Sequence, residues 1–202
     1  MQDLIQPCFA DEKDRTQTPE LPPIPPRPPV LCAGCAHRGP FYVLRQLDAI
    51  VSGDIGCYTL GALAPLDAMD SCMSMGASVG IAHGMEKIMT EEERRRLVAV
   101  IGDSTFFHSG ISGLVDVLYN GGQTTTLILD NRTTAMTGHQ EHPGSGLTLQ
   151  QNKSVEIALE DLCRGLGIHR VTRVDPYDLV ALRRTLDREM RTDEPSVIIA
   201  EA

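Results

Sequence analysis

The stretch VAVIGDSTFFHSG, residues 98–110, determines how the chain folds around its candidate site. Residues 98–101 are apolar and mostly β-branched, which predicts a buried strand. Gly102 permits a tight turn, after which a helix begins. Asp103 therefore lies between a strand and a helix, where its carboxylate either caps the helix or holds a cation against an anionic ligand. The free N–H groups of a helix N-terminus favour a phosphate at this place.

Strands and helices alternate on both sides of this stretch. We expect an α/β fold in three layers, with a mostly parallel sheet covered by helices on both faces. The expected strands are 49–56, 97–103, 124–131, 169–175 and 196–202, and the expected helices are 39–50, 74–89, 109–120, 155–167 and 176–190. Between them we expect a solvated turn over residues 90–96 and a long polar loop over residues 133–148.

The chain has 202 residues, of which 42% are hydrophobic, and this is enough to bury the core of one domain. Residues 18–29, TPELPPIPPRPP, contain too many prolines for a helix or a central strand. We therefore expect a proline-rich tail or linker over residues 1–29 and one folded domain over residues 30–202. A stiff linker and a loose terminus fit the composition equally well. The last expected strand reaches the end of the sequence, so we expect a fragment of a longer chain.

The formal net charge of −9 and the pI near 5.1 argue against binding to nucleic acid or to an anionic membrane surface. No apolar run approaches the roughly 20 residues of a membrane span. The acidic N-terminus also lacks the apolar core of a signal peptide. We expect a cytoplasmic protein with neither a nucleic-acid partner nor a membrane partner.

Asn131 lies at the end of the next expected strand and is the candidate that would hold a cation together with Asp103. If the two strands are adjacent and parallel, their carboxyl ends meet at one edge of the sheet. A carboxylate oxygen, an amide oxygen and the backbone carbonyl of Thr133 would then form half of an octahedral oxygen shell. Mg²⁺ prefers such a shell and usually completes it with phosphate oxygens and water.

This arrangement resembles the thiamine diphosphate motif, a Gly-Asp-Gly triplet followed by an Asn after the next strand. Gly102, Asp103 and Asn131 match the motif, and Ser104 stands in the place of the third small residue. By this resemblance Asp103, Asn131 and the Thr133 carbonyl hold Mg²⁺, while the metal and the backbone around Ser104 hold the diphosphate. The alternative is that Asp103 caps a helix and Asn131 shapes a turn.

Three further stretches resemble the thiamine-binding part of the 2-oxoacid:ferredoxin oxidoreductase family, most of all the large subunits of its indolepyruvate branch. They are PPVLCAGCAHRG (28–39), GDIGCYTLG (53–61) and LDNRTTAMTGHQ (129–140). The resemblance runs from Pro28 to Ala202. It implies oxidative decarboxylation of an aryl pyruvate on thiamine diphosphate, transfer of the acyl group to coenzyme A, and transfer of two electrons through iron–sulfur clusters to ferredoxin.

The same resemblance gives three cysteines a role. Cys32, Cys35 and Cys57 match thiolates that hold a 4Fe–4S cluster near the thiamine, and we also count Cys57 among the expected cofactor-binding residues. Such a cluster takes four thiolates, and the fourth lies near or beyond the end of this chain in related enzymes. A zinc site and buried, inert thiols remain alternatives. Among the histidines, His37 and His139 are the candidates for contact with cofactor or substrate, whereas His142 gives no usable signal.

The resemblance also indicates what the chain lacks. Thiamine activation in these enzymes uses a Glu from a separate pyrimidine-binding domain, so we assign no catalytic residue here and expect the chain alone to be inactive. The implied partners are that domain in the same or another subunit, a smaller β subunit, ferredoxin, a 2-oxoacid and coenzyme A, within an oligomer. A non-redox thiamine enzyme, such as a decarboxylase or an acetolactate synthase-like protein, and a non-catalytic assembly module are the rival interpretations.

Overall fold

The computed structural model describes residues 25–202, so most of the predicted tail lies outside the described residues. A six-stranded sheet forms the centre, in the order β2-β1-β3-β4-β6-β5, and all of its neighbouring strands are parallel. The strands are β1 (Ile50–Gly53), β2 (Ser71–Cys72), β3 (Leu97–Gly102), β4 (Thr125–Asp130), β5 (Arg170–Val174) and β6 (Ser196–Glu201). The mostly parallel sheet that the sequence predicts is therefore confirmed.

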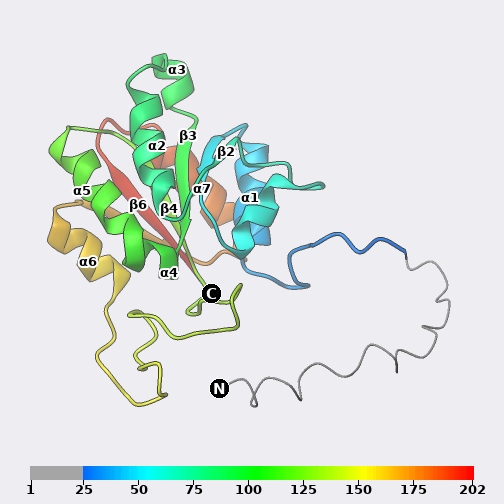
Figure 1. Cartoon of the computed structure of the whole chain (residues 1–202). Helices are drawn as coiled ribbons and strands as arrows, with labels where there is room; N and C mark the ends of the chain where they lie inside the picture. The colour runs from blue at the N-terminus through cyan, green and yellow to red at the C-terminus, as the bar shows by residue number, and fades with distance from the viewer. Residues whose placement is uncertain (1–24) are drawn as a thin grey trace, which may run out of the picture.

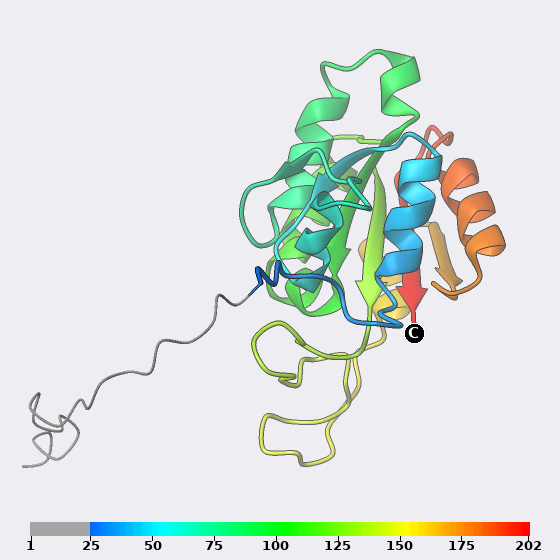
Figure 2. The same ribbon diagram turned by 90° about the vertical axis from the view of Figure 1, so that its right-hand side faces the viewer.

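Helices cover both faces of this sheet, with α1 and α7 on one face and α2, α5 and α6 on the other (Figures 1 and 2). The α-helices are α1 (Arg38–Gln46), α2 (Ala77–Glu86), α3 (Glu91–Arg94), α4 (Asp103–Thr105), α5 (Ile111–Tyr119), α6 (Leu159–Leu166) and α7 (Leu179–Glu189). A 3-10 helix, η4 (Cys57–Ala62), and a π-helical turn, η5 (Phe106–Gly110), complete the set. Within residues 25–202, no helix combines the length and the apolar character that crossing a membrane requires.

The central strand β3 shows why the sheet needs helices on both sides. Val98 and Val100 pack into the core beneath α1 and α7, while Ala99 and Ile101 pack into the core beneath α2, α5 and α6. All four side chains are fully buried. Burial of a Val or Ile side chain stabilises a fold by roughly 1.5–3 kcal/mol, so a strand that is apolar on both faces stabilises the sheet only between two layers.

The expected elements differ from the observed ones mainly at their ends. Residues 90–96, which we expect to form a turn, contain the one-turn helix α3, which begins with a reciprocal cap between Thr90 and Glu93. The expected helix 155–167 begins only at Leu159, because its N-cap residue Ala158 has an extended backbone. The short strand β2 and the helix η4 have no periodicity from which the sequence could predict them.

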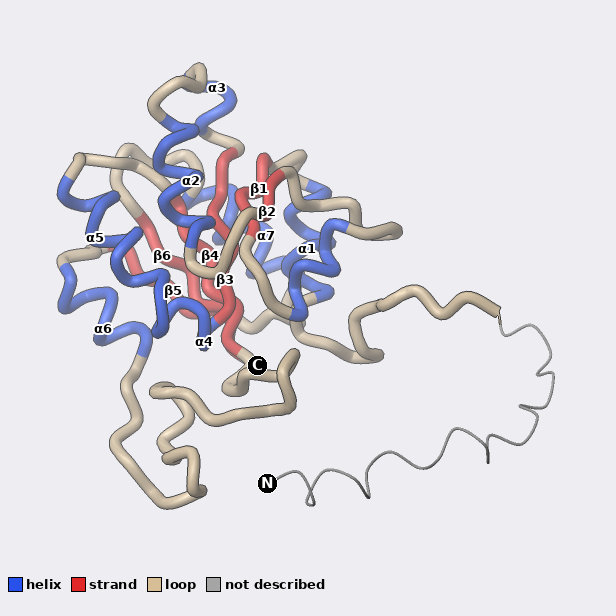
Figure 3. The backbone as a smooth tube through the Cα atoms, viewed as in Figure 1, coloured by secondary structure: helices blue, strands red, loops and turns tan. Residues whose placement is uncertain are grey.

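The carboxyl edge of the sheet is the part of the fold that matters for function. Strands β3 and β4 are neighbours, and Gly102 pairs with Leu129, so the two strands end at the same level. The loop between β4 and α6, residues 131–158, lies beyond this edge (Figure 3). Two isolated bridges, between Thr134 and Gln140 and between Leu147 and Lys153, fold the loop back on itself.

Candidate cofactor site at the carboxyl edge of the sheet

A cavity of about 270 Å³ lies where β3 and β4 end, and we call it the strand-end cavity. The cofactor residues predicted from the sequence all line it: Gly102, Asp103, Ser104, Asn131, Thr133 and Cys57. Adjacent parallel strands bring these residues together, as expected for ligand sites in parallel α/β sheets. The structure therefore gathers in one cavity residues that lie far apart in the sequence, from Cys57 to Thr133.

Gly102 is required at the cavity because of the neighbouring ring of Tyr58. A Cβ atom at Gly102 would lie 2.5 Å from Cε1 of that ring, and a Cβ at Gly56 would lie 2.4 Å from it. The ring is buried, and its hydroxyl donates to the carbonyl of Ile55 at 3.0 Å. Burial raises the pKa of the Tyr58 hydroxyl, so it stays protonated. The two glycines thus let η4 close tightly over the end of β3.

Asp54 connects the end of β1 to the start of α2 beneath this closure. Its carboxylate is fully buried and accepts the N–H groups of Ile55 and Gly76 at 2.8 Å and of Ser78 at 3.0 Å. Because backbone N–H groups are fixed in direction, three such bonds hold the carboxylate rigidly. Asp54 therefore fixes the position of the Cys57 segment relative to the strand-end cavity.

Asp103 places a buried carboxylate at the cavity, with only 3% of the residue exposed. Oδ1 accepts the N–H of Ser104 at 2.7 Å, whereas Oδ2 has no hydrogen-bond partner in the described part of the chain. The helix-cap interpretation is wrong, because Gly102 occupies the N-cap position of α4 and no side chain caps it. A buried carboxylate oxygen without a partner is costly unless a donor or a cation completes it. Nε2 of His142 lies 3.1 Å from Oδ2 without forming a hydrogen bond, and a carboxylate oxygen has a second lone pair, so Asp103 fits a cation.

Ser104, the departure from the thiamine motif, is joined to the loop after β4. Its Oγ lies 2.7 Å from Oγ1 of Thr134, which also lines the strand-end cavity. The side chain is small and buried, so it leaves the cavity open above the backbone. This contact links the two strand ends directly.

Asp130 and its neighbour Asn131 line different cavities. Burial, and then the nearby Asp103 carboxylate, raise the pKa of Asp130 to about 6. Its Oδ1 accepts the N–H of Arg132 at 3.1 Å. Asp130 lines a second cavity instead of the one that Asn131 and Thr133 line.

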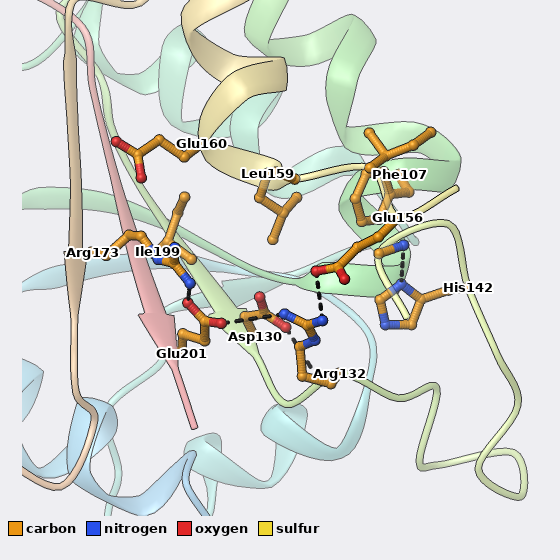
Figure 4. Close-up of a pocket in the computed structure, with 13 residues that line it drawn as sticks. Phe107, Asp130, Arg132, His142, Glu156, Leu159, Glu160, Arg173, Ile199 and Glu201 are labelled. Atoms are coloured by element: carbon orange, nitrogen blue, oxygen red, sulfur yellow. Dashed lines mark hydrogen bonds and ion pairs between the residues drawn. The ribbon is translucent and has the colours of Figure 1, made fainter. Parts of the chain in front are cut away.

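This second cavity, of about 60 Å³, is filled by opposite charges, and we call it the ion-pair cavity (Figure 4). The Arg132 guanidinium lies 2.6 Å from Glu156 and 3.3 Å from Glu201. Arg173 forms a further ion pair with Glu201. Arg132 starts the long loop and Glu156 lies near its end, so the ion pair closes the loop at its base.

The three cysteines predicted to hold a cluster lie close to one another but do not form a metal site in this structure. Cys32 is exposed, Cys35 and Cys57 are half-buried, and all three are free thiols. Burial first, and then the neighbouring Cys35 and Cys32, raise the pKa of the Cys57 thiol. Among residues 25–202, no group of three or more His, Cys, Asp or Glu side chains is arranged to hold a metal ion.

The histidines that lie near the cavity residues are not the same two that the sequence predicts. His37 is buried in the wall of the strand-end cavity, edge-on to Tyr58, and burial lowers its pKa against the attraction of Asp103. His139 is exposed and does not line the cavity. His142, which gives no signal in the sequence, is buried with its Nε2 atom 3.1 Å from Oδ2 of Asp103. Only the folding of the loop brings that pair together.

The sheet is wholly parallel, and the strand-end cavity contains a buried carboxylate that could bind a cation. These two features define an α/β cofactor-binding domain. The model of the family "Thiamine pyrophosphate enzyme, C-terminal TPP binding domain" matches residues 54–200. This match covers more than two thirds of the chain, which therefore belongs to that family and is a thiamine diphosphate-binding domain.

Curated relatives agree with the resemblance predicted from the sequence. The chain is 42% identical over 176 residues to an indolepyruvate oxidoreductase subunit IorA from Archaeoglobus fulgidus, and 41% identical over 183 residues to one from Thermococcus kodakarensis. These matches cover 85% and 84% of this chain but 28% of each relative. The chain thus spans little more than a quarter of the length of the relatives that it matches.

Solved structures share the fold at low sequence identity. A 2-oxoglutarate:ferredoxin oxidoreductase from Magnetococcus marinus matches with a TM-score of 0.71 and 16% identity, over 87% of this chain and 64% of the other. A 4-hydroxybenzoylformate decarboxylase from Rhodococcus jostii RHA1 matches with a TM-score of 0.59 and 18% identity, over 94% of this chain and 36% of the other. At such identities the likeness concerns the fold alone.

Proposed function

We propose that this chain holds the Mg²⁺–diphosphate end of thiamine diphosphate in a 2-oxoacid:ferredoxin oxidoreductase of the indolepyruvate type. The observation that supports the metal assignment most strongly is the buried Oδ2 atom of Asp103, which has no hydrogen-bond partner in the described residues and belongs to a residue that lines the strand-end cavity. Carboxylate, amide and carbonyl oxygens are the ligands that Mg²⁺ prefers beside phosphate.

Each residue of the proposed site has a separate task. Asp103 supplies the negative charge, and Asn131 and the carbonyl of Thr133 supply neutral oxygens. The backbone around Gly102 and Ser104 receives the diphosphate, since neither residue projects a large side chain into the cavity. When bound, thiamine diphosphate supplies the carbanion stabilisation that 2-oxoacid decarboxylation needs.

The proposed activity of the whole enzyme is the oxidative decarboxylation of an aryl pyruvate such as indolepyruvate. One carbon–carbon bond breaks and carbon dioxide leaves. The acyl group forms a thioester with coenzyme A, whose thiol proton is released, and two ferredoxins each accept one electron. The names of the relatives support this proposal. Because the chain spans 28% of those relatives, we propose that a pyrimidine-binding domain and a smaller β subunit complete the enzyme.

The cysteines are the proposed route for the electrons. Cys32, Cys35 and Cys57 would give three thiolates to a 4Fe–4S cluster, with a fourth ligand from outside the described residues. Their proximity supports this proposal, because Cys35 and Cys32 lie near enough to raise the pKa of the Cys57 thiol. A non-redox thiamine enzyme has no use for such a cluster.

The decisive experiment uses the complete complex, purified without oxygen from cells that also produce the partner subunits. We expect indolepyruvate to reduce ferredoxin only when coenzyme A is present, and we expect the protein to contain iron and sulfide. Cys57→Ser should lower the iron content, whereas Cys163→Ser, on the buried side of α6, should not. Release of the aldehyde without ferredoxin reduction would instead identify a non-redox decarboxylase. Normal assembly without any cofactor would identify an assembly module.

A further inference from the structure

His142 is a buried histidine that the proposed function has not used. It comes from the long loop between β4 and α6, yet its side chain is fully buried. Its Nε2 atom lies 3.1 Å from Oδ2 of Asp103, whose side chain is 4% exposed. The alignment falls outside that of a formed hydrogen bond, so neither atom has any hydrogen-bond partner in the described residues.

The other ring nitrogen of His142 determines where the imidazole proton lies. The backbone N–H of Gly144 donates to Nδ1 at 3.1 Å. A backbone N–H can only donate, so Nδ1 must accept and cannot carry a proton. In the neutral imidazole the proton is then on Nε2, the atom that faces Asp103.

The surroundings hold the imidazole ring in this orientation. Phe107 lies against it, with the ring centres 5.7 Å apart. A Cβ atom at Gly144 would lie 2.8 Å from Phe107, so glycine alone lets the chain turn beneath the ring. The N–H of Ser145 donates to the carbonyl of His142 at 2.9 Å, which fixes the backbone as well.

We propose that His142 is a positioning residue for Asp103, one whose Nε2–H group, 3.1 Å from Oδ2, attracts the carboxylate electrostatically and holds it in the orientation a cation needs. The inference rests on the proposed function, since it concerns the carboxylate proposed as the Mg²⁺ ligand. Oδ1 is already held by the N–H of Ser104, so the two contacts fix the plane of the carboxylate from both sides. Metal-ligating carboxylates generally need such supporting donors.

A purely packing role explains less of the geometry. An apolar ring of similar size would fill the same space against Phe107 without burying two polar atoms that lack partners. The pair also joins the loop to β3, because His142 belongs to the loop and Asp103 directly follows the strand. Closure of the loop and orientation of the carboxylate are therefore one event.

The tautomer can be measured directly in the complete chain without cofactor. In long-range ¹⁵N–¹H spectra of protein labelled with [¹⁵N]histidine, we expect the His142 proton on Nε2, with the signal assigned by its loss in His142→Gln. Asp103→Asn should shift this signal and leave that of His139 unchanged. A proton on Nδ1, or rapid exchange of the proton between the two nitrogens, would overturn the proposal.

Binding measurements test the consequence for the metal. Calorimetric titration of the complete complex, freed of cofactor, with thiamine diphosphate and Mg²⁺ should show that His142→Phe, which keeps the packing, weakens the Mg²⁺-dependent binding by roughly 10–100-fold. His142→Gln keeps a donor near Nε2 and should retain most of the affinity, and the loop control His139→Asn should match the wild type.

The outcomes separate the two claims. A wild-type chain that binds while His142→Phe binds equally well would overturn the positioning role alone, as would His142→Gln binding as weakly as His142→Phe when both variants are folded. A wild-type complete complex that shows no Mg²⁺-dependent binding would overturn the proposed function and the positioning role with it.

Discussion

Two cavities lie at the end of β4, and their charged groups differ in whether they are paired with an opposite charge. In the strand-end cavity, Asp103 presents a carboxylate oxygen that lacks a hydrogen-bond partner within the described residues. In the ion-pair cavity, Arg132 and Arg173 lie against Glu156 and Glu201, so these charges neutralise each other. Successive residues of one segment line the two cavities: Asn131 lines the strand-end cavity and Arg132 lines the ion-pair cavity.

This difference separates a place that can receive a ligand from a place that holds the structure together. Opposite charges that already pair with each other gain little from a further ion, whereas a buried carboxylate oxygen without a partner gains a great deal. The ion pairs close the loop of residues 131–158 at its base, and the closed loop presents His142 to Asp103. Substitutions on the two sides should therefore have different effects on binding and on stability.

Gly102→Ala should have the largest effect, because the new methyl group would lie 2.5 Å from the ring of Tyr58. That ring is buried and cannot yield easily, so we expect a loss of about 1–3 kcal/mol in the free energy of unfolding, together with weaker cofactor binding. Chemical denaturation measures the first effect. Gly80→Ala in α2 is the control, since nothing lies within 4 Å of its Cβ position. Equal stability of both variants would contradict the close fit of the ring on Gly102.

Asn131→Ala should come next and should act on binding more than on stability. Loss of the amide oxygen removes one proposed Mg²⁺ ligand, so the affinity for thiamine diphosphate with Mg²⁺ should fall roughly 10–100-fold. Titration calorimetry measures this change, and the thermal midpoint should stay close to that of the wild type. Asn152→Ala, at an exposed position of the same loop, should leave the affinity unchanged. Unaltered affinity in Asn131→Ala would exclude Asn131 from the metal site.

The pH dependence of the free energy of unfolding should show the raised pKa of Asp130. Its pKa is raised from 3.8 in the unfolded chain to about 6 in the fold, so the folded protein binds the proton more tightly. This contribution to stability is complete below about pH 4 and is lost as the pH rises through 6. Asp130→Asn should therefore be more stable than the wild type at pH 7–8, and the difference should shrink toward pH 4. Thermal unfolding across this range, with exposed Asp116→Asn as reference, checks the sign; a difference that grows toward low pH would contradict it.

Arg132→Met should have a small effect on stability and the smallest effect on cofactor binding. Partly exposed ion pairs contribute at most about 1 kcal/mol, and the Arg132 side chain is 38% exposed. We expect faster proteolysis within residues 131–158, with a smaller change in cofactor affinity than Asn131→Ala produces. Arg183→Met, on the exposed face of α7, has no ion pair to lose in the described chain and serves as the control. Unchanged proteolysis would show that Arg132 does not close the loop.

Much of the fold follows from the sequence for a simple physical reason. Strands buried on both faces need apolar side chains on both faces, and the apolar runs 97–101 and 127–129 indicate such strands. Adjacent parallel strands then bring Asp103 and Asn131 to one edge, which is why the order of strands along the chain is enough to pair these two residues. The resemblance to the thiamine family added the identity of the ligand, which apolar pattern alone does not encode.

The rest of the site depends on contacts that no local pattern records. The fit of Tyr58 on two glycines, the approach of His142 to Asp103 and the separation of Asp130 from Asn131 all depend on how segments far apart in sequence pack. His139 and His142 lie in the same polar loop, and only its folding exposes one and buries the other. Turns and loops of this kind have little periodicity to read.

The central claim is that Asp103 makes the binding of thiamine diphosphate depend on Mg²⁺. The most direct test compares the wild type with Asp103→Asn, which keeps the size of the side chain and removes its charge, in calorimetric titrations with thiamine diphosphate in the presence and absence of Mg²⁺. We predict that Mg²⁺ strengthens binding to the wild type and has no such effect on Asp103→Asn. Equal strengthening by Mg²⁺ in both proteins would contradict the assignment of Asp103 as the metal ligand.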